Sequence, residues 1–167
     1  MSNHRFAIWW LLEEEHSDRY QLEINKLAER FSTPLFLPHI TVVSGIEDKA
    51  IGRRLVDQLS EHTIRFDAKI DKLEHRAIYY QSFFLHLRSA TFHSTWARCK
   101  HAASSPVATY EPHLSLLYQS PELFDHSAFS VFDPPTESIT IDKVALFETS
   151  GVVETWQCIL TRDLQNA

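Results

Sequence analysis

Glycine, cysteine and long apolar runs are scarce in this chain of 167 residues. Only three glycines occur, which disfavours wide flexible loops. Two cysteines, Cys99 and Cys158, are too few for a disulfide framework, so we expect two ordinary thiols in a reducing compartment, with a single regulatory disulfide left open. No apolar run approaches the roughly 18–20 residues that cross a bilayer, and the opening residues lack the pattern of a secretory signal. We therefore expect a cytoplasmic protein with no membrane partner.

Basic residues are also few. The chain has 16 Lys and Arg against 22 Asp and Glu, for a formal net charge of −6, and no basic cluster of the nucleic-acid-binding type. Such a balance repels a long polyanion rather than attracting it. A general DNA or RNA binder is therefore not expected, whereas a small nucleotide held by a few local groups is compatible with the charge.

The apolar content is ordinary for a globular protein, at 44% of the residues. Eleven Phe, five Tyr and four Trp can build a sizeable core without covalent staples. The length fits one domain, or one domain made of two similar lobes. We expect a single bilobal domain over residues 1–167, acting as a monomer.

Hydrophobic periodicity predicts an α+β chain with mainly antiparallel sheets. The helix expected over residues 17–31 has Ser17 as its N-cap, and Gly45 marks a turn. The other expected helices cover residues 47–62 and 90–103. The expected strands cover residues 6–12, 38–44, 64–74, 78–88, 112–118, 138–148 and 155–161.

One short pattern occurs twice. Residues 38–43 read Pro-His-Ile-Thr-Val-Val, and residues 112–117 read Pro-His-Leu-Ser-Leu-Leu. With this composition, a second copy arises by chance about once in a few hundred chains. The two copies lie about half the chain length apart, which suggests two related lobes that each contribute one strand.

Strand geometry gives the repeat a chemical meaning. Residues i and i+2 of a strand face the same way, so His39 shares a face with Thr41, and His113 shares a face with Ser115. The apolar residues between them point to the opposite side. If the lobes lie side by side, two imidazoles and two hydroxyls converge on one groove.

Two imidazoles and two hydroxyls suit the hydrolysis of a phosphodiester. Water attack on phosphorus needs a base for the water and an acid for the leaving oxygen, and imidazole titrates near neutral pH. Thr and Ser hydroxyls can donate hydrogen bonds to the phosphate oxygens. A zinc site is the rival chemistry, but the chain has neither H-E-x-x-H nor C-x-x-C, and no third ligand at a recognisable spacing. We expect neither a metal nor another cofactor.

The paired motifs resemble those of the 2H phosphoesterase superfamily, which is defined by two His-x-Thr/Ser signatures. Softer matches point to the cyclic phosphodiesterases of the plant and yeast type within it. These matches are the opening strand with Trp9, the segment IYYQSFFLHL at 78–87 and the segment VALFETSGVVETWQCIL at 144–160. The resemblance implies a bilobal fold in which two antiparallel sheets face each other across a groove, with helices outside.

The resemblance also implies residue roles and substrates. His39 and His113 match the catalytic histidines, and Thr41 and Ser115 match the phosphate-binding hydroxyls. By analogy, His113 activates the water and His39 protonates the leaving oxygen. The family's substrates are small cyclic phosphates: nucleoside 2′,3′-cyclic phosphates and ADP-ribose 1″,2″-cyclic phosphate, the latter linked to tRNA splicing. A small molecule of this type is the expected partner.

Further aromatic and histidine residues are weaker candidates. Trp9 and Tyr118 are expected beside the groove, where either could stack a base or line the pocket, although Trp9 could equally belong to the core. Tyr118 has the wrong parity to face the groove unless its strand bends or ends there. Trp156 is expected in the core, and His86 in a structural role near the groove. The other histidines receive no catalytic role.

Two other functions stay open. One keeps the superfamily but acts on RNA ends, as a 2′,3′-cyclic phosphodiesterase or a 2′,5′-linkage enzyme, and it would favour a basic groove. The other is a non-catalytic nucleotide-binding module. Intact histidines and hydroxyls in both motifs argue against the module, because binding alone needs no acid–base pair.

Overall fold

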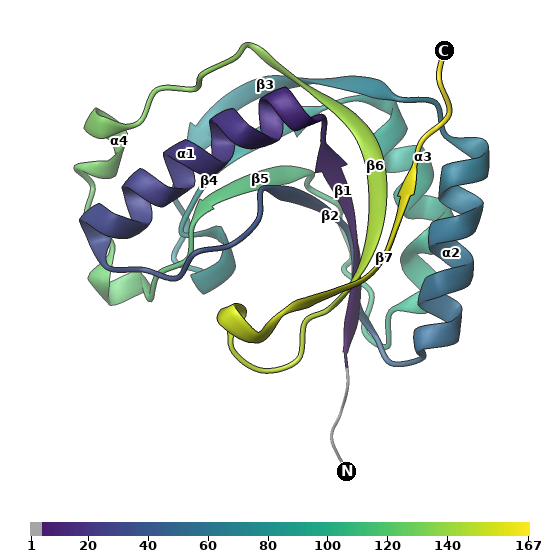
Figure 1. Ribbon diagram of the computed structural model, residues 1–167. Helices are drawn as coiled ribbons and strands as arrows, with labels where there is room; N and C mark the ends of the chain where they lie inside the picture. Colours follow the sequence, from purple (N-terminus) through teal and green to yellow (C-terminus); the bar gives the residue numbers. More distant parts are fainter. Residues whose placement is uncertain (1–4) are drawn as a thin grey trace.

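A computed structural model describes residues 5–167 (Figure 1). The α+β architecture predicted from the sequence is confirmed. The strands are β1 (Phe6–Leu12), β2 (His39–Ile46), β3 (Phe66–Glu74), β4 (Phe83–Arg88), β5 (His113–Leu117), β6 (Ser138–Glu148) and β7 (Gln157–Asp163). The α-helices are α1 (Glu14–Phe31), α2 (Lys49–His62), α3 (Ala90–Cys99) and the short α4 (Ala128–Val131). Two of the 3₁₀ turns bear on the site, η1 (Tyr79–Gln81) and η2 (Lys100–Ala102).

All the strands join one seven-stranded antiparallel sheet with the order β2-β1-β6-β3-β4-β5, and β7 pairs with β6. One lobe consists of β1, β2, β6 and β7, and the other of β3, β4 and β5. They are joined where Phe66–Lys69 of β3 pairs with Ser138–Ile141 of β6. The sheet curls, as Figure 1 shows, so that its outermost strands β2 and β5 come into contact.

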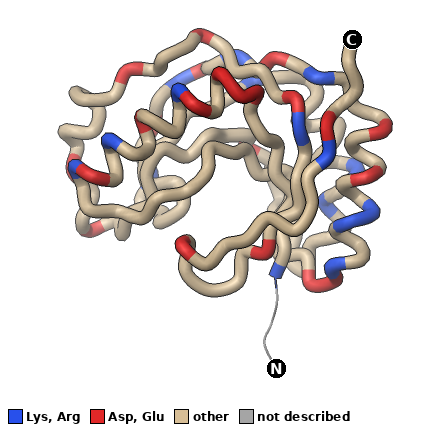
Figure 2. Tube along the Cα trace, in the orientation of Figure 1, with Lys and Arg blue, Asp and Glu red and all other residues tan. Residues whose placement is uncertain are grey.

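Helices cover the outside of the curled sheet. Helix α2 packs on β6 and β7, α3 packs on β2, and α1 packs on β5. Figure 1 shows α2 and α3 on one flank, with α1 and α4 on the other. Figure 2 shows that charged positions gather on the outer helices, while the inner strands are mostly uncharged. This is the distribution expected when each helix buries an apolar stripe.

Two local expectations are wrong. Helix α1 begins at Glu14 rather than at Ser17, so Ser17 lies inside its first turn instead of capping it. Glu14 and Glu15 in that turn favour the earlier start, because negative side chains stabilise a helix N-terminus. The strand expected over 78–88 begins only at Phe83, because η1 occupies its first part.

The described residues add two findings about covalent and membrane features. Cys99 is buried and Cys158 is exposed, and both are free thiols. No helix between residues 5 and 167 is long and apolar enough to span a membrane.

Helix α2 approaches β6 closely at Gly52. A Cβ atom added there would lie 2.6 Å from Cδ1 of Leu146. Leu146 is fully buried, so its side chain has little room to move. The missing side chain therefore sets how closely this helix lies against the sheet.

We predict that Gly52→Ala lowers the free energy of unfolding by about 1–2 kcal/mol, because overpacking outweighs the better helix propensity of alanine. Chemical denaturation measures the change. Arg53→Ala, at an exposed position of the same helix, is the control and should change stability by less than about 0.5 kcal/mol. Equal stability of the two variants would contradict this packing argument.

Candidate active site

The two repeated motifs begin the two outermost strands of the sheet path. His39 is the first residue of β2, and His113 is the first residue of β5. Because the sheet curls, the four predicted side chains lie in the wall of one cavity of about 710 Å³: His39, Thr41, His113 and Ser115. The structure thus brings both motifs to one site.

Both histidine rings are held by the same backbone contact. Nδ1 of His39 lies 2.6 Å from the carbonyl oxygen of Leu37, and Nδ1 of His113 lies 2.8 Å from that of Glu111. A carbonyl oxygen can only accept a hydrogen bond, so Nδ1 carries the proton in each ring. In the neutral ring, Nε2 is then the acceptor, and in His113 it lies 3.4 Å from the Gln81 amide nitrogen. In each motif, the contact spans the proline that precedes the histidine.

The surroundings disfavour a charged imidazole at both positions. Burial lowers the pKa of His39 to about 4, against an opposing effect of the Leu37 carbonyl, and His113 lowers it further. Burial also lowers the pKa of His113, with the Glu111 carbonyl opposing, and electrostatic interactions with His86 and Arg76 add to the lowering, while the Glu111 carboxylate works against it. Two neutral rings at neutral pH follow for the ligand-free site. An anion between them would reverse the effect, because a nearby negative charge favours the protonated form.

The two hydroxyls of the motifs differ in their partners. Ser115 Oγ donates to the carbonyl oxygen of Tyr80 over 2.7 Å, and a hydrogen bond also links its side chain to Tyr118. Thr41 accepts from the Tyr110 hydroxyl through its main-chain carbonyl, at 2.7 Å. Its own hydroxyl makes no hydrogen bond to another described side chain or backbone group. Thr41 is therefore the hydroxyl with a proton available for a ligand.

Trp9 lines the cavity, but its ring faces are covered. It stacks on His39 with a centroid distance of 3.5 Å and an interplanar angle of 14°, and on Phe147 at 4.0 Å and 23°. Stacking of a nucleobase on Trp9 is thus not available in this arrangement. The indole instead fixes the plane of the His39 ring and contributes to its burial.

Other aromatic residues line the same cavity, and one of them, Trp156, lies 5.8 Å from Trp9 between ring centroids and corrects one expectation. Strand β5 ends at Leu117, so the alternation of side chains along the strand does not apply to Tyr118. Tyr118 lines the cavity, and its ring stacks on Phe36 with a centroid distance of 3.9 Å. Trp156, expected in the core, is partly exposed and also lines the cavity. Tyr80, in η1, is 48% exposed and lies 5.8 Å from Trp156 between ring centroids. Tyr80 and Trp156 therefore keep part of their surfaces open to a ligand.

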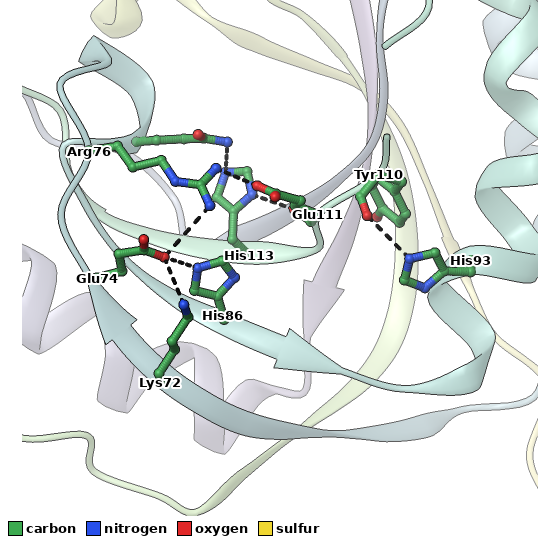
Figure 3. A network of polar contacts seen from close by, with 9 residues as sticks. Lys72, Glu74, Arg76, His86, His93, Tyr110, Glu111 and His113 are labelled. Carbon is green, nitrogen blue, oxygen red and sulfur yellow. Dashed lines mark hydrogen bonds and ion pairs between the residues drawn. The ribbon is translucent and has the colours of Figure 1, made fainter. Parts of the chain in front are cut away.

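An ion-pair network flanks His113 (Figure 3). Arg76 pairs with the carboxylates of Glu111 and Glu74, and Figure 3 shows its guanidinium beside the His113 ring. Because Glu111 also supplies the carbonyl that holds His113, the network anchors the residue on which the ring rests. The sequence analysis did not identify Arg76, because the ion-pair partners of a single arginine in a loop cannot be recognised from the neighbouring residues.

His86 belongs to the same network and has the expected structural role. It pairs with Glu74 and does not line the cavity. His39 and His113 are the two histidines of the cavity wall among residues 5–167, and His4 lies outside the described residues. Gln81, also in the wall, places its Nε2 3.4 Å from Nε2 of His113. Within the described part of the chain, no three His, Cys, Asp or Glu side chains are grouped to hold a metal ion.

Known proteins resemble this chain in sequence and in fold. No established family profile matches the chain. A cyclic phosphodiesterase of Arabidopsis thaliana is 24% identical over 172 residues, covering 95% of this chain and 94% of that protein. A crystal structure of a phosphoesterase superposes with a TM-score of 0.67 at 14% identity, covering 98% of this chain and 99% of its own. LigT of E. coli, in complex with ATP, superposes with a TM-score of 0.66 at 14% identity, over 99% of this chain and 100% of its own.

These likenesses agree with the resemblance of the paired His-x-Thr/Ser motifs to the 2H phosphoesterases. The curled antiparallel sheet has the fold of LigT.

The burial of His39 gives a direct spectroscopic prediction. In the ligand-free protein, the His39 ring should titrate with a midpoint of about 4, because burial penalises the imidazolium. Inorganic phosphate should move the midpoint upward. NMR titration of the imidazole Cε1–H signals measures both, and His39→Asn assigns the resonance by removing it. A midpoint at or above the ordinary value of 6.5 would contradict the buried neutral ring.

Proposed function

We propose that this protein is a metal-independent cyclic phosphodiesterase that opens small cyclic phosphates by paired histidine acid–base catalysis. One observation carries the proposal. Two imidazoles, each held through Nδ1 by a backbone carbonyl, lie in the wall of one cavity with Nε2 as the atom left to react. Binding alone would not need two such rings, whereas hydrolysis needs both a base and an acid.

The similar proteins support the substrate class. The Arabidopsis protein is named as a cyclic phosphodiesterase. LigT has been crystallised with ATP, NADP⁺, phosphate and 3′-AMP, all of which carry phosphate groups. We infer that the substrates here are nucleoside 2′,3′-cyclic phosphates and ADP-ribose 1″,2″-cyclic phosphate, acted on in the cytoplasm by a monomer.

The reaction can be written with every proton accounted for. Nε2 of His113 takes a proton from water as the water oxygen attacks phosphorus. Nε2–H of His39 gives its proton to the leaving ring oxygen, so the P–O bond breaks without an alkoxide. From a nucleoside substrate the product is the 2′-phosphate, and from ADP-ribose cyclic phosphate it is ADP-ribose 1″-phosphate. The Thr41 hydroxyl donates to a non-bridging oxygen, where charge accumulates in the transition state, and the Ser115 hydroxyl donates to another once it turns away from the Tyr80 carbonyl.

Protonation of His39 is the demanding part of this scheme. With a pKa of about 4, the ring is neutral in the empty site at neutral pH and cannot act as an acid. The cyclic phosphate carries a negative charge, and its arrival between the rings favours one imidazolium. The substrate thus creates the acid that its own cleavage requires.

Turnover assays test the proposal. With EDTA present, the protein should hydrolyse 2′,3′-cyclic AMP and ADP-ribose 1″,2″-cyclic phosphate. His39→Ala and His113→Ala should each lower kcat/KM by about 10²-fold or more, because each removes a proton-transfer group. Product identification by phosphorus NMR distinguishes the 2′-phosphate from the 3′-phosphate.

His62→Ala is the matched control, because His62 ends α2 and does not line the cavity. It should leave turnover unchanged. Loss of turnover with EDTA would overturn metal independence. Turnover of RNA ends alone would favour the RNA-end alternative, and binding without turnover of any substrate would favour the non-catalytic module.

The pH dependence follows from the lowered pKa values of the two rings. Above both pKa values the acid is deprotonated, so activity falls as pH rises through the upper one. For kcat/KM, which reports the free enzyme, this fall should begin below pH 6.5, because the pKa of each histidine is lowered from that value. For kcat, which reports the substrate complex, the fall should lie at higher pH. Coincident profiles that decline only above about pH 7 would contradict the scheme.

A further inference from the structure

The cavity extends well beyond the two histidines. Strand β2 runs along it from His39 to Gly45, and both residues are in its wall. Six steps at about 3.3 Å per residue give a length of about 20 Å. A single sugar with a cyclic phosphate fills only the His39 end of such a groove, so the other end is open to another part of the substrate.

Backbone pairing defines the far end, which we call the distal end. Phe6 pairs with Ile46, so the preceding Arg5 lies at the Gly45 end of β2. Ile46 also pairs with Ala103, and Ser104 donates from its amide to the Gly45 carbonyl at 3.1 Å. The distal end consists of the cavity-lining residues Arg5, Gly45, Trp96, Lys100, Ser104 and Thr149.

A row of packed side chains connects the distal end to the His39 end of the groove. The Tyr110 hydroxyl donates to the Thr41 carbonyl at 2.7 Å, and the Tyr110 ring stacks on Trp96 at 5.5 Å and 9°. The Lys100 ammonium lies 5.0 Å from the Trp96 ring centroid. Lys100 is therefore seated on an aromatic platform, and its position relative to Thr41 is set by packed rings rather than by a free side chain.

Charge distinguishes the distal end from the rest of this acidic protein. The cavity wall contains the cations Arg5, Arg76 and Lys100 but one acidic residue, Glu111. Arg76 is neutralised by Glu111 and Glu74. Lys100 forms no ion pair with any carboxylate that the structure describes. In a chain of net charge −6, an uncompensated cation inside a groove favours an anionic ligand.

We propose that the distal end is a second-phosphate subsite. It binds a phosphate group of the same substrate whose cyclic phosphate lies between His39 and His113, and Lys100, seated on the Trp96–Tyr110 stack that leads to Thr41, supplies the charge. This inference rests on the proposed function and narrows it, because substrates with a second phosphate are preferred over simple nucleoside cyclic phosphates. The second phosphate comes from a pyrophosphate bridge or from the phosphodiester of a short RNA end.

Substitutions at Lys100 test the subsite, with three substrates compared. They are 2′,3′-cyclic AMP, which has no second phosphate, ADP-ribose 1″,2″-cyclic phosphate, and a diadenosine nucleotide with a 2′,3′-cyclic end. Lys100→Ala should lower kcat/KM about 10-fold for a substrate with a second phosphate, as expected for one charge-assisted contact, and Lys100→Glu should lower it further. For 2′,3′-cyclic AMP both changes should stay below about two-fold.

Arg98→Ala and Arg98→Glu are the matched controls, because Arg98 is an exposed cation of α3 outside the cavity wall. They should change the three substrates equally. Selective losses in the Lys100 variants support the subsite, and the substrate with the larger loss identifies the source of the second phosphate. Equal effects of Lys100 and Arg98 variants, or equal effects on all three substrates, would overturn it.

A binding measurement separates this inference from the proposed function. Calorimetry with ADP-ribose compares the wild-type protein with the Lys100 and Arg98 variants, and it needs no turnover. Weaker binding in the Lys100 variants alone supports the subsite even if no cyclic phosphate is hydrolysed. Unchanged binding in those variants overturns the subsite even if 2′,3′-cyclic AMP is hydrolysed.

Discussion

The site depends on one stretch of backbone pairing, the seam between Phe66–Lys69 of β3 and Ser138–Ile141 of β6. This seam joins two lobes of strands into a single curled sheet. Without it, β2 and β5 would be the edges of two separate sheets, with no reason to face each other. Each motif contributes its residues to one cavity wall, so the relative placement of the lobes is part of the site.

The two motifs have the same local backbone contact, but their histidines lie in different electrostatic surroundings. Both rings rest on the carbonyl two residues earlier, with a proline between. His39 is then covered by Trp9, whereas His113 is partly exposed and borders the Arg76 network. A repeated sequence thus gives rings of the same orientation in different surroundings. In the proposed mechanism, that difference would let one ring serve as acid and the other as base.

Local pattern predicted much of this arrangement, and tertiary contacts decided the rest. The alternation of side chains along a strand predicted that each histidine shares a face with the hydroxyl residue two positions later, because this alternation is a property of the strand itself. Parity alone would turn Tyr118 away from the cavity, but β5 ends at Leu117, which is the condition under which Tyr118 was expected beside the groove. The turn at Tyr79–Gln81 was missed inside an apolar run that reads as a strand. The pairing of Arg76 with Glu111 joins residues far apart in sequence, so no local pattern encodes it.

The curling of the sheet also protects its margins. An outermost strand presents unpaired backbone groups that can recruit a strand from another chain. Here β2 turns inward against β5, the Tyr110 hydroxyl takes the Thr41 carbonyl, and Ala103 pairs with Ile46. Backbone groups that would otherwise invite edge-to-edge aggregation are thus occupied within the molecule. A change that opened the groove would disturb the site and at the same time expose a strand edge able to pair with another chain.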